Sequence, residues 1–176
     1  QYWPDNAAGP YYGNIKPGKC INLRATWGGI TYDLYTGFIE TWLPKWAEIA
    51  GLGSYFQLTC ADLIKKLARL EITDGVGYSA ELSGTRIGNV LNVQGCPVAL
   101  RDIDAGQSTM QATGALVDAN AMEHLFKVQE SERGQFFIAG DGKATFHDRH
   151  ARFNSPFTTS QAIFGDDAGE NSYQIR

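Results

Sequence analysis

The stretch Gly18–Trp42, with the sequence GKCINLRATWGGITYDLYTGFIETW, decides how the first part of this chain folds. Apolar and polar residues alternate over Ile21–Trp27, and a period of two places each set on its own face of a β-strand. The dipeptide Gly28-Gly29 fits a two-residue hairpin turn, because glycine adopts positive φ at little cost. The alternation resumes over Ile30–Leu34. The stretch therefore predicts a β-hairpin with one buried apolar face and one face in water.

The alternation fails at Thr36-Gly37, where Phe38 and Ile39 place two apolar residues side by side. A glycine inside a strand often marks a β-bulge, which bends the strand. We therefore expect the second half of this strand to change direction at Gly37.

Length and composition indicate a folded protein with a substantial core. The chain has 176 residues, 43% of them hydrophobic and 19% charged, as in ordinary folded domains. No apolar run approaches the roughly 20 residues of a membrane span, so we expect no stable membrane insertion. Because the chain begins with Gln1, we interpret it as a processed product or as part of a longer chain.

The charge distribution argues against nucleic-acid binding. The net charge is −4, and the imbalance lies in residues 101–176, which hold 7 Lys and Arg against 11 Asp and Glu. Proteins that bind nucleic acids carry a basic surface. The three cysteines are widely separated and include no Cys-x-x-Cys pair, so we expect buried free thiols rather than disulfides or a zinc site.

The first 17 residues have no periodicity and contain three of the chain's six prolines. Proline lacks the amide donor and disfavours a helix at the residue before it, so this segment should be extended. It also carries large apolar side chains that need cover. Either the segment lies across its own domain or it packs on a neighbouring subunit. The candidate subunit contacts are Tyr2, Trp3, Tyr11, Tyr12 and Ile15.

Three helices and a second hairpin are predicted further along the chain. A helix over residues 61–72 should be capped by Thr59 or Asp62, with its three basic residues facing water. A second helix should end at Gly95, and a third should begin at Asn120 and end at Gly134. A hairpin follows over residues 135–149. We divide the chain into an extended arm (1–17), a β-rich lobe with one helix (18–74), and an α+β lobe with an irregular C-terminal tail (75–176).

No residue pattern predicts a catalytic, cofactor or metal site. The densest cluster of reactive side chains is His147-Asp148-Arg149-His150, but on a strand an odd step of three places the two histidines on opposite faces. Asp102 and Asp104 form a carboxylate pair that is more typical of turn caps than of acid–base catalysis. We therefore interpret both groups as structural and predict neither an enzyme nor a bound cofactor.

Several stretches, taken in order, resemble the minor tail proteins of long-tailed bacteriophages. They are NAAGPYYGNIKPGK, LRATWGGITYDLYTGFIETW, LTCADLIKKLARLEI, LSGTRIGNVLNVQGCP, DIDAGQSTMQA, AMEHLFKVQESERGQFFIAGDGKATFHDRH and SQAIFGDD. Members of that group commonly have tryptophan where this chain has Cys96, and they extend further at both ends. The chain thus resembles a fragment or a short member of the group.

The resemblance implies an α+β fold of the tail-tip or baseplate hub type. An antiparallel β-sandwich or barrel-like lobe, related to the tail tube, would carry packed helices beside a smaller lobe of two helices and a β-hairpin. The chain would form a homo-oligomeric ring, a trimer or hexamer, around the DNA channel of the virion's tail tip, after assembly in the host cytoplasm. Other tail proteins (distal tail, tape measure and tail fibre) would be its partners.

In this interpretation the chain supports host attachment and DNA passage without chemistry of its own. An acidic surface would let DNA pass without sticking, and the bend at Gly37 would direct the strand toward a neighbouring subunit. Two alternatives remain. One is a module that binds the host surface, with its loop aromatics stacking on glycans, and the other is a cell-wall hydrolase.

Overall fold

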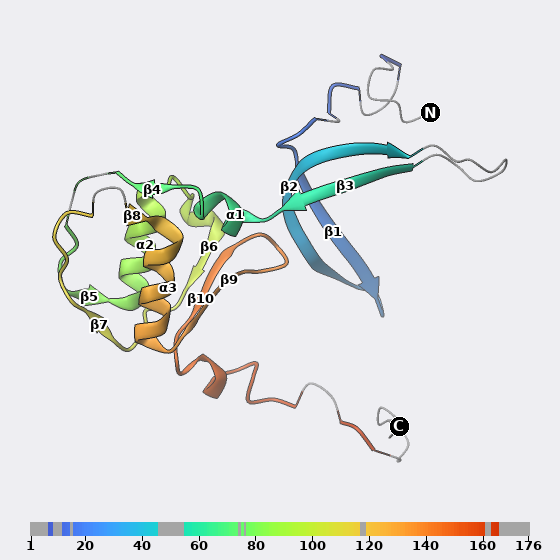
Figure 1. Cartoon of the computed structure of the whole chain (residues 1–176). Helices are drawn as coiled ribbons and strands as arrows, with labels where there is room; N and C mark the ends of the chain where they lie inside the picture. Colours follow the sequence, from blue (N-terminus) through green and yellow to red (C-terminus); the bar gives the residue numbers. More distant parts are fainter. Residues whose placement is uncertain are drawn as a thin grey trace, which may run out of the picture.

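The computed structural model describes residues 7–8, 12–14, 16–45, 55–73, 75, 77–116, 119–160 and 163–165. It has an open β-sheet on one side and a lobe of helices and short strands on the other (Figure 1). The α+β class expected from the sequence is confirmed. The sandwich or barrel-like closure of the first lobe is not seen, because within the described residues this lobe is a single three-stranded sheet.

The first sheet is antiparallel, in the order β1-β2-β3, and its strands are β1 (Cys20–Trp27), β2 (Ile30–Lys45) and β3 (Tyr55–Ala61). The predicted hairpin is confirmed: Trp27 pairs with Ile30 across a turn whose two glycines have φ of 57° and 81°. Positive φ at both turn residues matches the right-handed twist of the strands. β3 pairs only with the second half of β2, from Phe38 onward.

The bulge predicted at Gly37 is wrong. The ladder runs regularly through Gly37, which pairs with Ile21, and the register shifts instead between Leu23 and Arg24 and near Glu40. A Cβ on Gly37 would lie 2.3 Å from the Tyr35 hydroxyl and 2.6 Å from the carbonyl oxygen of Ala61. Glycine is therefore required here for close packing beside the end of β3. Because there is no bulge at Gly37, the predicted bend at this residue is also wrong.

The second lobe is built around two helices that pack on each other, α2 (Ser83–Val93) and α3 (Ala121–Glu132). Short strands surround them: β4 (Glu71–Ile72) pairs with β8 (Ala119–Asn120), and β5 (Glu81–Leu82) with β7 (Thr109–Met110). A mixed sheet has the order β6-β10-β9 and comprises β6 (Arg101–Ile103), β9 (Gln135–Ile138) and β10 (Ala144–His147). Two 3₁₀ turns, η1 (Val98–Leu100) and η2 (Ala151–Phe153), complete the described elements. The fully buried core includes Ile87, Leu91, Leu125 and Phe146.

The first helix is shorter than predicted. α1 (Leu63–Leu67) begins after Asp62, whose carboxylate caps the amide of Lys65, as one of the two expected caps. It ends early because Glu71 and Ile72 pair with β8 instead of continuing the helix. Leu67 and Ile72 belong to the core of the second lobe, although they lie before the boundary that the sequence placed between residues 74 and 75.

The other two helices lie where their sequence signals placed them. α2 is followed by Gly95 at φ 67°, and the side chain of Asn120 accepts a hydrogen bond from the amide of Glu123 at the start of α3. The end of α3 differs in one respect. Arg133, rather than Gly134, takes the left-handed conformation, with φ 58° and ψ 29°.

The two parts of the chain touch at the tip of the β9–β10 hairpin, which points toward β2 in Figure 1. The hydroxyl of Thr36 donates a hydrogen bond of 2.8 Å to the carbonyl oxygen of Gly140. A Cβ on Gly140 would lie 2.1 Å from the carbonyl oxygen of Asp33, so glycine permits this approach.

The three cysteines differ in their exposure to solvent. Cys96 is buried as expected, whereas Cys20 is exposed and Cys60 half-buried; all three are free. Among the described residues, no helix is long and apolar enough to span a membrane.

Candidate functional site

The apolar face of the β1–β2 hairpin is exposed. The cross-strand pairs Trp27–Ile30 and Ala25–Tyr32 lie on this face, as does Leu23. The exposed fractions are 82% for Trp27, 59% for Ile30, 56% for Leu23 and 48% for Tyr32. The strands were predicted correctly, but the burial of this face was not, because the hairpin extends beyond the lobe that could cover it (Figure 1).

The opposite face of the hairpin is polar and internally hydrogen-bonded. Three cross-strand pairs follow one another along it: Asn22 donates to Thr36 at 2.6 Å, Arg24 to Asp33 at 2.6 Å, and Thr26 lies 3.0 Å from Thr31. The hydrogen bond from Arg24 is the main reason that the pKa of Asp33 lies below its ordinary value, and Asn22 adds to the effect. This face is suited to water, whereas the other face of the hairpin exposes apolar side chains.

The candidate contacts of the N-terminal arm are almost entirely outside the described residues. Tyr12 is described and is 55% exposed. Tyr2, Trp3, Tyr11 and Ile15 lie outside the described part of the chain. Their role in subunit contact stays a prediction.

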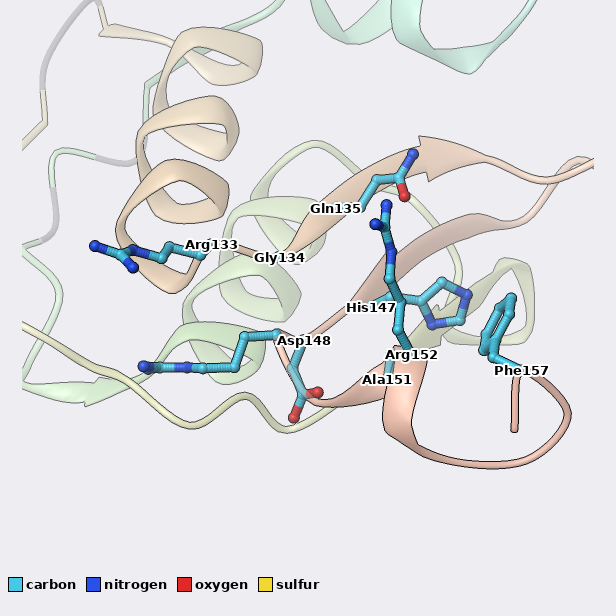
Figure 2. A pocket seen from close by; sticks show the side chains of 9 residues that line it. Arg133, Gly134, Gln135, His147, Asp148, Ala151, Arg152 and Phe157 are labelled. Atoms are coloured by element: carbon cyan, nitrogen blue, oxygen red, sulfur yellow. The ribbon is translucent and has the colours of Figure 1, made fainter. Parts of the chain in front are cut away.

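A cleft of about 380 Å³ lies where the end of α3 meets the end of β10 and η2 (Figure 2). Its walls are unusually basic and include an aromatic ring. The lining residues are Arg133, Gly134, Gln135, His147, Asp148, Arg149, Ala151, Arg152 and Phe157. The turn after β10 brings the His147–Arg152 segment beside the end of α3, 14 or more residues earlier in the chain.

Glu132 lies behind the lining of this cleft and binds one of its arginines, Arg149. Its side chain is fully buried and accepts hydrogen bonds from the Ser83 hydroxyl (2.8 Å), the amides of Gln107 (3.1 Å) and Ser108 (2.6 Å), and Nε of Arg149 (3.0 Å). Burial alone would raise its pKa, but these four donors outweigh burial and lower the pKa to about 2. The carboxylate therefore stays ionised and holds Arg149 in place.

The side chains of the His147-Asp148-Arg149-His150 cluster have separate partners in this structure. Nδ1 of His147 lies 3.5 Å from Asp104, and its ring packs against Phe137 and Phe157. His150 lies in the turn after β10. Among the described residues, no group of three or more His, Cys, Asp or Glu side chains is placed to hold a metal ion.

The carboxylates near the cleft are used to shape the turn. Asp148 accepts from the amide of His150 (2.8 Å) and from Nε2 of Gln107 (2.7 Å), and Asp104 accepts from the amide of Asp148 (3.0 Å). Asp148 thus caps its own turn, whereas Asp104, one of the two acids interpreted from the sequence as turn caps, bonds across to a segment 44 residues away. Asp102, the other member of the predicted pair, lies on β6 opposite Thr145 of β10.

Sequence reasoning missed the basic part of the cleft. Arg133, Arg152 and Phe157 were not singled out, because they come from separate segments with no common spacing. One local signal exists: an arginine directly before Gly134 at a helix end takes the position that glycine usually fills.

Comparison with known proteins gives a likeness in structure. No protein-family model and no curated protein sequence matches the chain. The fold resembles the crystal structure of the 43 kDa tail protein of prophage MuSo2 from Shewanella oneidensis, with a TM-score of 0.51 and 18% sequence identity. The match covers 76% of this chain and 39% of that protein, so this chain spans well under half the length of its structural neighbour. At this identity the likeness establishes a shared fold.

Proposed function

We propose that this chain is a structural subunit of a phage tail and forms part of a homo-oligomeric ring, a trimer or hexamer, at the tail tip or baseplate hub. The tail-protein fold supports the first part of the proposal. The exposed apolar face of the β1–β2 hairpin carries the second. The other partners would be further tail proteins, and the role is mechanical rather than catalytic.

Physical chemistry favours covering this face with another subunit. Burying one large aliphatic or aromatic side chain contributes roughly 1.5–3 kcal/mol, and four such side chains, Leu23, Trp27, Ile30 and Tyr32, are adjacent here and about half or more exposed. A contiguous exposed apolar patch with a polar rim is typical of an interaction surface. The outer edge of β1 is also unpaired within the described sheet, and an edge of this kind accepts a further strand.

The test is the oligomeric state of matched variants, measured by light scattering coupled to size-exclusion chromatography. Trp27→Lys with Tyr32→Lys places two charges on the apolar face and should convert the oligomer into a monomer. Thr26→Lys with Thr31→Lys adds the same charge at the neighbouring positions on the opposite face and should leave the oligomer intact. A wild-type chain that stays monomeric at every concentration, or an apolar-face variant that assembles normally, would refute the ring.

A truncation of the N-terminal arm is a second variant for the same experiment. Deleting residues 1–17 should abolish assembly, because Tyr2, Trp3, Tyr11, Tyr12 and Ile15 are proposed as subunit contacts. The truncated chain should still unfold cooperatively, since the core lies in residues 67–146. Ring formation by the truncated chain would remove the arm from the interface.

One observation also fits a second candidate function, a module that binds glycans on the host cell surface. Trp27 and Tyr32 are exposed on one face of the hairpin, and aromatic rings of this kind can stack on apolar faces of sugars. A monomeric chain that binds cell-wall glycans, and loses that binding in Trp27→Ala, would favour this function over the ring.

A further inference from the structure

We propose that the arginine-rich cleft at the end of α3 binds an acidic polypeptide segment, one that presents at least two carboxylates and an apolar side chain. This goes beyond the ring and does not depend on the hairpin face. The cleft brings together Arg133, Arg149 and Arg152 with Gln135, beside the ring of Phe157 (Figure 2). Guanidinium groups match carboxylates in geometry and charge.

Arg133 is the first sign that the cleft has a ligand. It is the single non-glycine residue with positive φ in the described part of the chain, and φ is 58°. This conformation is unfavourable for a residue with a Cβ, and helices commonly end with glycine at such a position. Strain of this kind collects where a side chain has a function, and stability alone would favour glycine.

The charges of Arg133 and Arg152 are not neutralised within the described residues. Other arginines are: Arg24 pairs with Asp33, Arg86 with Glu81, and Arg149 with Glu132. The backbone amide of Arg133 bonds to the end of α3, but no hydrogen bond or ion pair joins the guanidinium group of Arg133 or of Arg152 to another described residue. Asp148, the acid that lines the cleft, already accepts hydrogen bonds from the Gln107 side chain and from the amide of His150. Because neither guanidinium group has an acidic partner among the described residues, an added anion is a suitable partner for both.

The arrangement favours an extended ligand over a single small ion. In Figure 2 the side chain of Arg133 extends away from the end of α3, whereas that of Arg152 extends beside Gln135, so the two point to different parts of the cleft. Two carboxylates on one segment could meet both. Phe157 is 55% exposed and packs edge-on to His147, with ring centroids 5.9 Å apart. It offers an apolar contact beside His147 and Arg152, on the side away from Arg133.

The surroundings favour a polypeptide over DNA. A nucleic-acid groove needs a continuous basic track along which phosphates release counterions. Here Asp148 lines the cleft itself and Asp104 lies beside it, 3.5 Å from His147. The chain as a whole carries a net charge of −4. A short acidic segment can occupy the cleft without bringing a long polyanion against these carboxylates.

The experiment is a fluorescence anisotropy titration of the full chain with a labelled, end-capped pentapeptide of sequence Asp-Glu-Phe-Asp-Glu at low ionic strength. Saturable binding is expected, and the amide analogue Asn-Gln-Phe-Asn-Gln should not bind. Arg133→Gly should weaken binding about tenfold, the usual effect of losing one charge-assisted hydrogen bond, while the melting temperature stays the same or rises because glycine relieves the positive φ. A purely structural role for Arg133 would not give this combination.

Two further variants complete the design. Arg152→Gln, at an exposed position outside regular helix and strand, should weaken binding by a similar factor without depending on the helix end. Arg69→Gln removes one exposed positive charge outside the cleft and should bind as wild type. The proposal is overturned if the acidic peptide does not bind, or if Arg133→Gly and Arg152→Gln bind it normally. Complete displacement by millimolar orthophosphate, or tighter Arg133-dependent binding of a labelled DNA oligonucleotide, would likewise overturn it.

Discussion

Replacing Glu132 with glutamine should destabilise the chain strongly, and in a pH-dependent way. The carboxylate is not exposed to water, and it accepts hydrogen bonds from four donors. A glutamine has the same shape, but it carries no charge and turns an NH₂ group toward neighbours that are themselves donors. The variant therefore leaves Arg149 without its counter-charge and some buried donors without acceptors.

The magnitude follows from the pKa of this group. The pKa is lowered from an ordinary value of 4.5 to about 2 in the folded chain. Each unit corresponds to about 1.4 kcal/mol, so ionised Glu132 contributes about 3 kcal/mol at neutral pH. In a chain of 176 residues, a loss of that size lowers the melting temperature by roughly 6–12 °C.

The sign of the pH dependence is fixed by the direction of this change. Because the folded pKa lies below the unfolded one, the stabilisation is fully present above pH 4.5 and disappears as the pH falls through about 2. About 2 kcal/mol should be gone by pH 3. The difference in unfolding free energy between wild type and Glu132→Gln should therefore shrink steadily between pH 5 and pH 2.

Urea unfolding followed by circular dichroism at pH 7, 5, 4 and 3 measures this difference. Glu130→Gln is the matched control, since Glu130 is exposed on the same helix, and it should change stability little at any of these pH values. A wild-type advantage below about 0.5 kcal/mol at pH 7, or one that stays constant down to pH 3, would refute the reasoning.

Four other substitutions, each measured by its urea midpoint, test the packing and helix capping of the second lobe. Gly84→Ala should cost roughly 1–3 kcal/mol, because its Cβ would lie 1.9 Å from the carbonyl oxygen of Asp104; Gly88→Ala, on the same helix with open space around it, should instead gain about 0.5–1 kcal/mol. Asn120→Ala removes the cap of α3 and should cost about 1 kcal/mol, and an unchanged midpoint would contradict that role. Phe146→Ala empties a fully buried site and should cost roughly 3–5 kcal/mol; a smaller loss would mean that the core closes around the gap.

Local signals in the sequence determined the elements whose causes lie within a few residues. The turn at Gly28-Gly29 needs two residues with positive φ, and both glycines adopt it. The cap at Asn120 acts on an amide three residues away. For that reason the hairpin and the start of α3 could be predicted without knowledge of the rest of the fold.

Tertiary structure decided what is buried and which side chains meet. The apolar face of the hairpin obeys the period of a half-buried strand, yet Trp27 is exposed because no other described element reaches it. The first helix stops early because Ile72 pairs with Ala119, 47 residues away. Likewise, the donors to Glu132 come from Ser83, the Gln107-Ser108 turn and Arg149, and the cleft beside it combines the end of α3 with the segment after β10. Burial and convergence depend on contacts between distant segments, and a pattern within one segment carries no information about them.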